Sequence, residues 1–239
     1  MIPHLFASRT YGSISVLVTN TFGGQSIAPY GQFNLADYVG DDSRSVAANQ
    51  QQLRSLLEAK QLKILSATHG NQVQVVTDES KVLPGDGLVT NCADVGLVAL
   101  AADCVPLALL DEHSGVIAVG HCGWQGLVNK LPMSLILEFE RQGGRADTSV
   151  AVIGPAICAS CYEVPAQRVD AVERVCPAAV RDQRHLAIAA GVRAELQSFG
   201  FSIDEIAACT FESNELYSFR RNRVTGRHAL AAVRHGGDN

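Results

Sequence analysis

The sequence predicts a mixed α/β fold of the α+β kind, built as a single domain over residues 1–239. Three observations lead to this prediction. The 239-residue chain is 47% hydrophobic and 18% charged, which supplies enough apolar material for one sizeable core. Several apolar runs are nearly continuous, as in strands of sheets that are covered on both faces. Hairpin-like pairs of such runs alternate with helical stretches, and no stretch has the composition of a linker.

The N-terminal part of the chain predicts a strand, a loop and a helix. Residues 13–19 (SISVLVT) form an apolar run typical of a strand, and residues 23–43 are rich in Gly, Asn and Asp, as in a long loop. Ser43 is the expected N-cap of a helix over residues 44–60. Apolar side chains recur through that helix at helical spacing, at Val46, Leu53, Leu56 and Leu57.

The rest of the chain predicts mostly strands, followed by helices. Residues 62–68 (LKILSAT) predict a strand that ends at His69, and residues 73–77 (VQVVT) predict another strand after a turn at Gly70 and Asn71. Further strands are expected at residues 95–101, 107–110, 116–120, 149–153 and 206–210, and helices at residues 127–142, 165–175 and 187–199.

Composition and charge exclude some classes of function. The net charge is −5, and no Lys/Arg run is long enough for a nucleic-acid-binding stripe. The local cluster Arg220, Arg221, Arg223 and Arg227 is better suited to a small anion. No apolar stretch approaches the ~20 residues of a membrane span, and the N-terminus lacks the pattern of a signal peptide. Because the cysteine count is seven, an odd number, we expect reduced thiols in a cytoplasmic protein.

Three residues have the types and positions expected of a metal site. His69, Cys104 and His121 each lie at or after a strand-like run, and strand ends that are far apart in sequence can converge on one cleft. A thiolate and two imidazoles suit zinc, and a set of three ligands leaves a fourth position open for water or substrate. A metal held in this way would act as a Lewis acid and lower the pKa of its water.

The residues alone leave other interpretations open. Cys104 is equally compatible with a core thiol, or with a nucleophile activated by His121 or His69, as in cysteine hydrolases. Asp103 fits a partner that orients an imidazole, but also a turn or cap residue. The Cys158-x-x-Cys161 pair has no second pair at zinc-finger distance, which favours a structural role over redox or metal chemistry.

Ordered motifs give the chain a resemblance to a known family. The motifs run from Gly23 to Arg227 and are GGQSIAPYGQFNLADYVGDD, THGNQV, AADCVPLALLD, GHCGWQG, GPAICASCYEV and FRRNRVTGR. This order resembles the YfiH family, also called the laccase-domain or polyphenol-oxidase family. The resemblance covers nearly the whole chain.

The resemblance implies a fold, a site and an activity. The fold would be a single domain of layered sheets and helices of the YfiH type. The metal ligands and catalytic residues would be His69, Cys104 and His121, with zinc as the cofactor and copper as the alternative. The activity would be phosphorolysis of adenosine, inosine and methylthioadenosine, together with deamination of adenosine. The partners would then be a small-molecule nucleoside and phosphate, with neither nucleic acid nor a membrane, and a homodimer is compatible with this assignment.

Further residues are expected to bind substrate. Arg220 and Arg221 are candidates for phosphate binding, because a guanidinium binds phosphate in a bidentate fashion. Trp124, the one tryptophan, is a candidate wall for a stacked purine. The chain departs from the family pattern at Gln125, where an arginine is usual, and at Thr21-Phe22, where an arginine usually precedes the GG segment. Residues 183–190 also lack the family's acidic pattern.

Composition argues against a true multicopper oxidase. The chain has seven histidines with no His-x-His pair, and its two methionines, Met1 and Met133, are poorly placed for an axial copper ligand. The alternatives to the nucleoside activity are a Cys-nucleophile amidohydrolase that edits peptidoglycan precursors, a copper-binding polyphenol oxidase, and a non-enzymatic scaffold.

Overall fold

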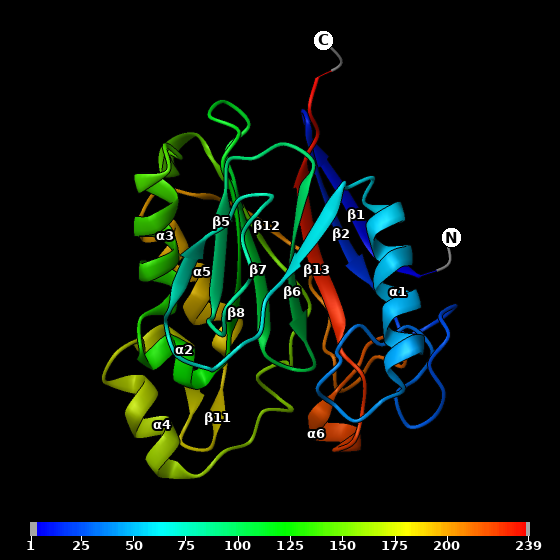
Figure 1. Ribbon diagram of the computed structural model, residues 1–239. Coiled ribbons are helices and arrows are strands. Elements are labelled where there is room, and N and C mark those ends of the chain that lie inside the picture. The colour runs from blue at the N-terminus through cyan, green and yellow to red at the C-terminus, as the bar shows by residue number, and fades with distance from the viewer. Residues whose placement is uncertain (1–3, 238–239) are drawn as a thin grey trace.

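The computed structural model describes residues 4–237 and consists of two β-sheets packed face to face between helices. Figure 1 shows helix α1 on the outer side of one sheet and helices α3 and α5 on the outer side of the other. The predicted mixed α/β class is therefore confirmed. Met1, which entered the argument about copper, lies outside the described residues.

The first sheet has five strands in the order β1-β2-β13-β6-β3. Its strands are β1 (Leu5–Tyr11), β2 (Ile14–Thr19), β13 (His228–Arg234), β6 (Val95–Ala101) and β3 (Gln61–Ile64). Strand β13 is antiparallel to both of its neighbours, β2 and β6, and it occupies the centre of the sheet. This central position explains why six of its seven residues are buried.

The second sheet has six strands in the order β12-β9-β7-β8-β5-β4. Its strands are β12 (Ser202–Glu205), β9 (Val150–Ile153), β7 (Val105–Leu110), β8 (Ile117–Cys122), β5 (Gly87–Thr90) and β4 (Val73–Val75). A separate small hairpin pairs β10 (Val180–Asp182) with β11 (His185–Leu186). Strands β7 and β8 form the central hairpin of the six-stranded sheet, and every residue in both strands is buried.

Three apolar cores correspond to the interfaces between the layers. The core between the sheets includes Val18, Leu97 and Val119, and the core under α1 includes Leu53 and Val98. The third core joins the six-stranded sheet to α3, α4 and α5. The helices are α1 (Ser43–Leu56), α2 (Trp124–Val128), α3 (Leu131–Arg141), α4 (Ala166–Glu173), α5 (Ile188–Ser198) and α6 (Phe219–Asn222), with 3-10 turns η1 (Ala146–Thr148) and η2 (Pro177–Ala179).

Two helix predictions are corrected in detail. The N-cap of α1 is Asp42 rather than Ser43, because the Asp42 carboxylate accepts hydrogen bonds from the amides of Arg44 and Ser45. The helix expected over residues 127–142 is two helices, α2 and α3. The chain breaks between them at Lys130, whose φ of 64° is left-handed, and Pro132 lies in the first turn of α3.

The strand predictions are corrected at several places. The strand expected at residues 206–210 is wrong, since the pairing strand is β12, which ends at Glu205. Strands β1, β5, β10, β11 and β13 were not expected. The strand expected over residues 62–68 ends at Ile64, so His69 lies in the loop after it. Strand β8 continues to Cys122, so His121 lies inside a strand rather than after one.

Candidate active site

Three side chains from three separate parts of the chain meet at one point. The ligand atoms of His69, Cys104 and His121 all lie within 4.8 Å of one another. His69 lies in the loop between β3 and β4, Cys104 in the turn between β6 and β7, and His121 near the end of β8. The two imidazole rings have centroids 5.0 Å apart and stand nearly perpendicular, at 72°. The structure thus brings together the three residues expected to bind a metal.

A buried residue, Asp86, contacts the segments of both histidines, through its carboxylate at His69 and through its backbone carbonyl at His121. Its side chain accepts hydrogen bonds from the Thr68 amide at 2.8 Å, the Thr68 hydroxyl at 2.7 Å and the Gly70 amide at 2.9 Å. These contacts flank His69, whose φ of 61° is unusual for a residue with a side chain. The carbonyl of Asp86 accepts a hydrogen bond from the amide of His121 at 3.0 Å. Sequence reasoning missed Asp86, because its role depends on contacts far along the chain.

The His121 ring is oriented so that one nitrogen is free for a ligand. Its Nδ1 lies 2.8 Å from the carbonyl oxygen of Leu100, while its buried Nε2 has no hydrogen-bond partner among the described residues. Burial, and then the neighbouring His69, lower the pKa of His121 to about 4. The ring is therefore neutral near pH 7, and a carbonyl contact at Nδ1 leaves the Nε2 lone pair available for a metal.

The backbone beside Cys104 approaches closely, and only glycine fits there. A Cβ atom on Gly123 would lie 2.9 Å from the Cys104 Sγ and 3.5 Å from the His69 Nδ1. Burial, and then the charge of Asp103, raise the pKa of the Cys104 thiol to about 12. A bound cation reverses such a preference and deprotonates a coordinating thiol. Three observations together fit a metal ion: the Cys/His₂ donor set, the His121 Nε2 without a hydrogen-bond partner among the described residues, and the close approach of the backbone at Gly123.

The hydrogen bonds of Asp103 connect neighbouring loops, and none of them reaches an imidazole among the described residues. Its carboxylate accepts hydrogen bonds from the Thr210 hydroxyl and from the Arg220 amide, both at 2.6 Å. The second bond satisfies an amide in the first turn of α6. Its carbonyl accepts a third bond from the Ile157 amide at 3.0 Å. Of the two interpretations left open by the sequence, the structure favours the cap residue.

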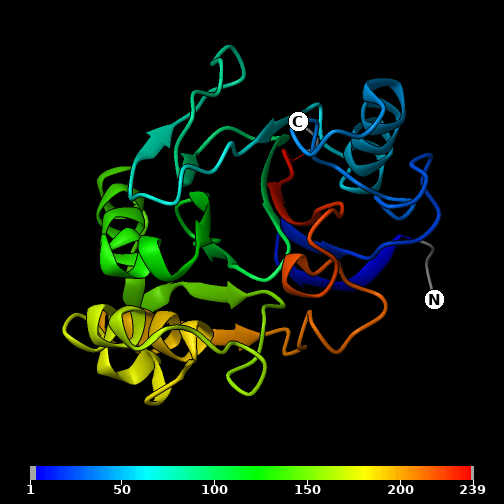
Figure 2. The ribbon, with the colours of Figure 1, turned by 90° about the horizontal axis from the view of Figure 1, so that it is seen from below.

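A cavity of about 490 Å³ opens onto the three candidate ligands. Helices α2, α4 and α6, which contribute to its wall, gather at the lower end of the molecule in Figure 1, and Figure 2 shows that end face-on. Four arginines line the cavity, whereas Asp103 is the one acidic residue in its lining: the arginines are Arg168, Arg220, Arg223 and Arg227. The cavity is therefore cationic, although the whole chain has a net charge of −5.

Aromatic rings form much of the remaining wall. Trp124 lies there as expected, and the guanidinium of Arg168 is 4.6 Å from the centroid of its ring. The guanidinium of Arg220 is 5.2 Å from the centroid of Tyr162. Stacked guanidinium–aromatic pairs of this kind hold the cation in place and leave donors available. Arg168 and Tyr162 were missed from the sequence, because neither lies in an apolar or basic run.

Two residues singled out from the sequence, Arg221 and Cys122, lie outside the cavity, whereas Gln125 lines it. The Arg221 guanidinium donates instead to the carbonyls of Thr210, Phe211, Ser213 and Leu216. The neighbour of His121, Cys122, faces the apolar core beneath α3, as the alternation along a strand predicts.

No helix among residues 4–237 is both long and apolar enough to cross a membrane.

Comparison with known proteins gives sequence and structural matches. A model of the family described as multi-copper polyphenol oxidoreductase laccase matches residues 15–235. A purine nucleoside phosphorylase of Corynebacterium glutamicum is 35% identical over 222 residues, which cover 88% of this chain and 90% of the relative. An adenosine deaminase, RL5, from an unknown prokaryotic organism is 33% identical over 157 residues, 61% of this chain and 60% of the relative. The crystal structure of YlmD from Geobacillus stearothermophilus is similar with a TM-score of 0.87 and 25% identity, over 98% of this chain and 100% of that one.

Proposed function

The chain belongs to the multi-copper polyphenol oxidoreductase laccase family, and from this premise we propose that it is a purine nucleoside phosphorylase with adenosine deaminase activity. Its substrates are adenosine, inosine and methylthioadenosine, with phosphate as the second substrate. The names of its relatives, a purine nucleoside phosphorylase and an adenosine deaminase, support both activities. The setting is the reducing cytoplasm, and neither nucleic acid nor a membrane takes part.

The observation that carries the proposal is the combination of groups in one cavity. The volume of about 490 Å³ lies within the usual range of small-molecule sites, which is roughly 300–1,000 Å³. Four arginines in the lining match a phosphate, and the aromatic wall matches a purine. The Cys/His₂ group lies in the same cavity, so one ligand could contact all three kinds of side chain.

The residues divide between the two substrates. Phosphorolysis requires a phosphate oxygen to attack the ribose C1′ while the purine leaves, so both partners must be held in line. Arg220 and Arg227 hold the phosphate, because both residues line the cavity and only the Nη1 of each guanidinium donates to backbone carbonyls, which leaves further donors for an anion. Trp124 forms the purine-facing wall together with Tyr162. Arg221 is not assigned to phosphate, since its guanidinium is bonded to four backbone carbonyls.

A metal ion, zinc in the first instance and copper as the alternative, would be held by His69, Cys104 and His121. When bound it supplies Lewis acidity and lowers the pKa of coordinated water. The chain's own part is to keep His121 neutral through burial and to hold Cys104 against Gly123. The name of the family refers to copper, but seven histidines without a His-x-His pair argue against a multicopper centre.

The raised pKa of the Cys104 thiol in the metal-free protein disfavours the amidohydrolase alternative. A nucleophilic thiol is active as the thiolate, and activation requires a lowered pKa or an adjacent base. Burial and Asp103 instead raise the pKa of Cys104 to about 12. Without a bound cation this thiol stays protonated at neutral pH, whereas a cation held by the Cys/His₂ group would stabilise the thiolate.

The test is a product assay on purified protein. With adenosine and phosphate we expect adenine and ribose 1-phosphate, and without phosphate we expect inosine and ammonia, both resolved by chromatography. Cys104→Ala and His121→Ala should each lower kcat at least 100-fold, whereas Cys92→Ala, at a cysteine outside the cavity, should not. Full activity in both ligand variants would contradict the site.

Inhibitors separate the alternatives. Loss of activity with a chelator and recovery on adding zinc would support the proposal. Full activity in chelator, combined with loss on thiol alkylation, would favour the cysteine nucleophile. Oxygen consumption on a phenol by the copper-loaded protein, without nucleoside turnover, would favour the polyphenol oxidase.

A further inference from the structure

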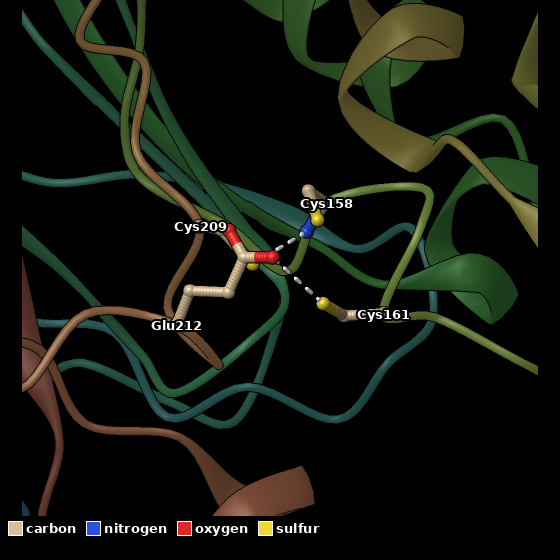
Figure 3. A group of neighbouring side chains, drawn as sticks. All are labelled: Cys158, Cys161, Cys209 and Glu212. Carbon is tan, nitrogen blue, oxygen red and sulfur yellow. Dashed lines mark hydrogen bonds between the residues drawn. The ribbon is translucent and has the colours of Figure 1, made fainter.

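Three cysteines and one glutamate lie together outside the active-site cavity. The Sγ atoms of Cys158, Cys161 and Cys209 and a carboxylate oxygen of Glu212 are all within 4.8 Å of one another. Figure 3 shows the four side chains converging from two segments, one with Cys158 and Cys161 and the other with Cys209 and Glu212. None of the four lines the cavity that contains His69 and His121. The sequence displayed the Cys158-x-x-Cys161 pair but not the two residues that complete the group.

The two segments are joined at the cluster by several hydrogen bonds. The Thr210 amide donates to the Ala156 carbonyl at 3.1 Å, and the Cys158 amide lies 3.3 Å from the Cys209 Sγ. The Cys161 thiol donates to Glu212 Oε1 at 3.4 Å. In the turn itself, the amides of Cys161 and Tyr162 both donate to the Cys158 carbonyl, at 3.1 and 3.0 Å. These bonds hold the backbones of the two segments together at the cluster.

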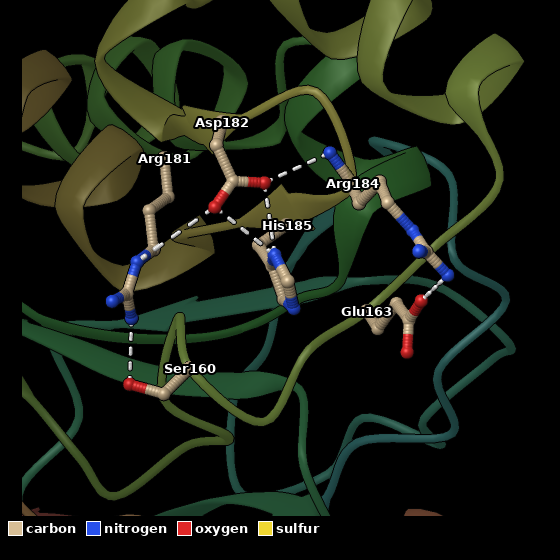
Figure 4. Close-up of polar contacts among 6 residues, drawn as sticks. All are labelled: Ser160, Glu163, Arg181, Asp182, Arg184 and His185. Atoms are coloured by element: carbon tan, nitrogen blue, oxygen red, sulfur yellow. Dashed lines mark hydrogen bonds and ion pairs between the residues drawn. The ribbon is translucent and has the colours of Figure 1, made fainter.

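Two arginines donate hydrogen bonds to the segments that contain the cluster. Arg221 donates to the carbonyls of Thr210, Phe211 and Ser213, which surround Glu212 in the chain. Arg181 donates to the hydroxyl of Ser160, inside the Cys-x-x-Cys turn, at 2.6 Å. Figure 4 shows this contact and, on the other side of Asp182 and His185, the ion pair of Arg184 with Glu163, which joins the same segment to the turn of the β10–β11 hairpin. These cations would offset the negative charge of a site with four anionic ligands.

We propose that Cys158, Cys161, Cys209 and Glu212 bind a structural zinc ion. A tetrahedral site with Zn–S bonds of about 2.3 Å places its ligand atoms ~3.8 Å apart, so the present spacing needs only a small contraction. Each thiol that coordinates releases its proton to solvent, and no oxidation takes place. Thiolates select zinc over magnesium or calcium, and four protein ligands leave no open position, as in structural rather than catalytic sites.

The ion would join two segments that build the active-site wall. Ile157 and Tyr162, on either side of the first pair of ligands, line the cavity. Thr210, beside Cys209, donates to Asp103, the neighbour of Cys104. The arrangement gives Arg221 a role as a positioning residue, because it holds the segment that contains Cys209 and Glu212. Zinc in this cluster would therefore maintain the shape of the cavity without touching substrate.

A disulfide is the rival explanation for the close thiols. It would use two of the three sulfurs and leave both the third thiol and the Glu212 carboxylate without a role. All the cysteines of the chain are free in the structure. The zinc site accounts for all four groups.

The first experiment measures zinc binding in a variant that lacks two of the three active-site ligands. Metal-free Cys104→Ala/His121→Ala protein is titrated with zinc against a chromophoric chelator. We expect one zinc per chain. Adding Cys161→Ser should weaken this affinity at least 100-fold, whereas Cys92→Ser, at a cysteine outside the cluster, should leave it unchanged. Circular dichroism confirms that each variant is folded. No zinc in the double variant, or zinc that Cys161→Ser does not affect, would overturn the proposal.

The second experiment needs no substitution. In wild-type protein, zinc should protect Cys158, Cys161 and Cys209 from alkylation, and a chelator should expose them, with mass spectrometry locating the label. The denatured protein should contain seven reactive thiols, matching its seven cysteines. Five thiols and a mass lower by two hydrogens would establish a disulfide and overturn the zinc site.

Zinc binding by the single variants separates the structural site from the active-site metal of the proposed function. If wild-type protein binds one zinc that Cys161→Ser removes and Cys104→Ala does not, the structural site holds and the metal in the active site is refuted. If the single zinc is lost with Cys104→Ala instead, the reverse follows.

Discussion

Gly123 determines how close the backbone comes to the candidate ligands. A Cβ there would be 2.9 Å from the Cys104 Sγ, inside van der Waals contact, so Gly123→Ala should displace the thiol. We expect zinc affinity at the Cys/His₂ site and kcat to fall about 10- to 100-fold, as for other changes that misorient metal ligands. Chelator competition and the adenosine assay measure both. Gly237→Ala, where a Cβ meets nothing within 4 Å, is the control; equal losses in the two variants would contradict the explanation.

Buried histidines should make stability depend on pH. Burial, and then the charge of Arg227, lower the pKa of His228 to about 3, and burial lowers the pKa of His121 to about 4. Near pH 5 the unfolded chain binds protons on both rings, because its histidine pKa is about 6.5, while the folded chain does not. The free energy of unfolding of metal-free protein should therefore fall as pH decreases from 6.5 to 4.5, by up to about 1.4 kcal/mol per pH unit for each ring.

Urea unfolding at several pH values in chelator tests this dependence. His228→Gln should remove about half of the slope, since one of the two rings remains. His113→Gln, at an exposed position, should leave it as in wild type. A free energy of unfolding that is flat between pH 6.5 and 4.5 in wild-type protein would contradict the prediction.

The candidate ligand residues can be predicted from the sequence, but the residues that hold them in place cannot. His69, Cys104 and His121 were selected from the sequence because each lies at or after a strand-like run and belongs to a metal-binding type. Asp86 could not be selected, since its contacts join residues 16 and 18 positions away. That the three residues bind a metal stays a prediction, although the structure places them together.

The conformation of the loop between β3 and β4 is held by three hydrogen bonds to a single carboxylate, that of Asp86. Asp86→Ala would remove three hydrogen bonds around Thr68 and Gly70 and release the left-handed backbone at His69. We expect zinc affinity to fall about 10- to 100-fold, and the free energy of unfolding to fall by about 1–3 kcal/mol because buried amides lose their acceptor.

Chelator competition and urea unfolding, both on folded protein, separate the two effects. Asp78→Ala, at an exposed carboxylate, is the control for a general loss of charge. Reduced stability with unchanged zinc affinity would show that Asp86 supports the fold alone.

Strands with continuous apolar runs were predicted correctly, whereas the polar edge strand β12 and the alanine-rich strand β13 were not. The continuous apolar runs of β6 and β7 were recognised, because central strands are buried on both faces. Strand β12 lies at a sheet edge and keeps polar residues, so the apolar residues 206–210 beside it were preferred wrongly. Strand β13 is rich in alanine, which has low β-propensity, and its central place follows from pairing with β2 and β6.

For the whole molecule, a cationic cavity in an acidic protein predicts anion-dependent stability. Phosphate that binds the folded state alone stabilises it by about 2.7 kcal/mol at 100 times its Kd, which corresponds to roughly 5–10 °C in Tm for a chain of this size. Arg220→Met and Arg227→Met should each remove most of this rise, whereas Arg174→Met, outside the cavity, should not. Sodium chloride at equal ionic strength controls for screening. An equal rise in chloride would contradict a specific phosphate site.

The class of the molecule was predictable, whereas its layering was not. Apolar runs and helical periodicity are local features, and they indicated a mixed α/β protein. Which strands share a sheet depends on pairs such as β13 with β2, whose partners Leu230 and Val18 lie at opposite ends of the described chain. No local pattern encodes such a pairing, because its energy comes from burial completed only in the assembled sheets.

The central place of β13 also has a consequence for synthesis. Strands β1 and β2 leave the ribosome before the other strands of their sheet, but they connect to β6 only through residues 228–234. Until those residues have left the exit tunnel, the five-stranded sheet exists as two separate parts with unpaired edges. Apolar strands of the nascent chain therefore stay exposed until β13 has been synthesised. This delay makes the nascent chain a candidate for chaperone binding during translation.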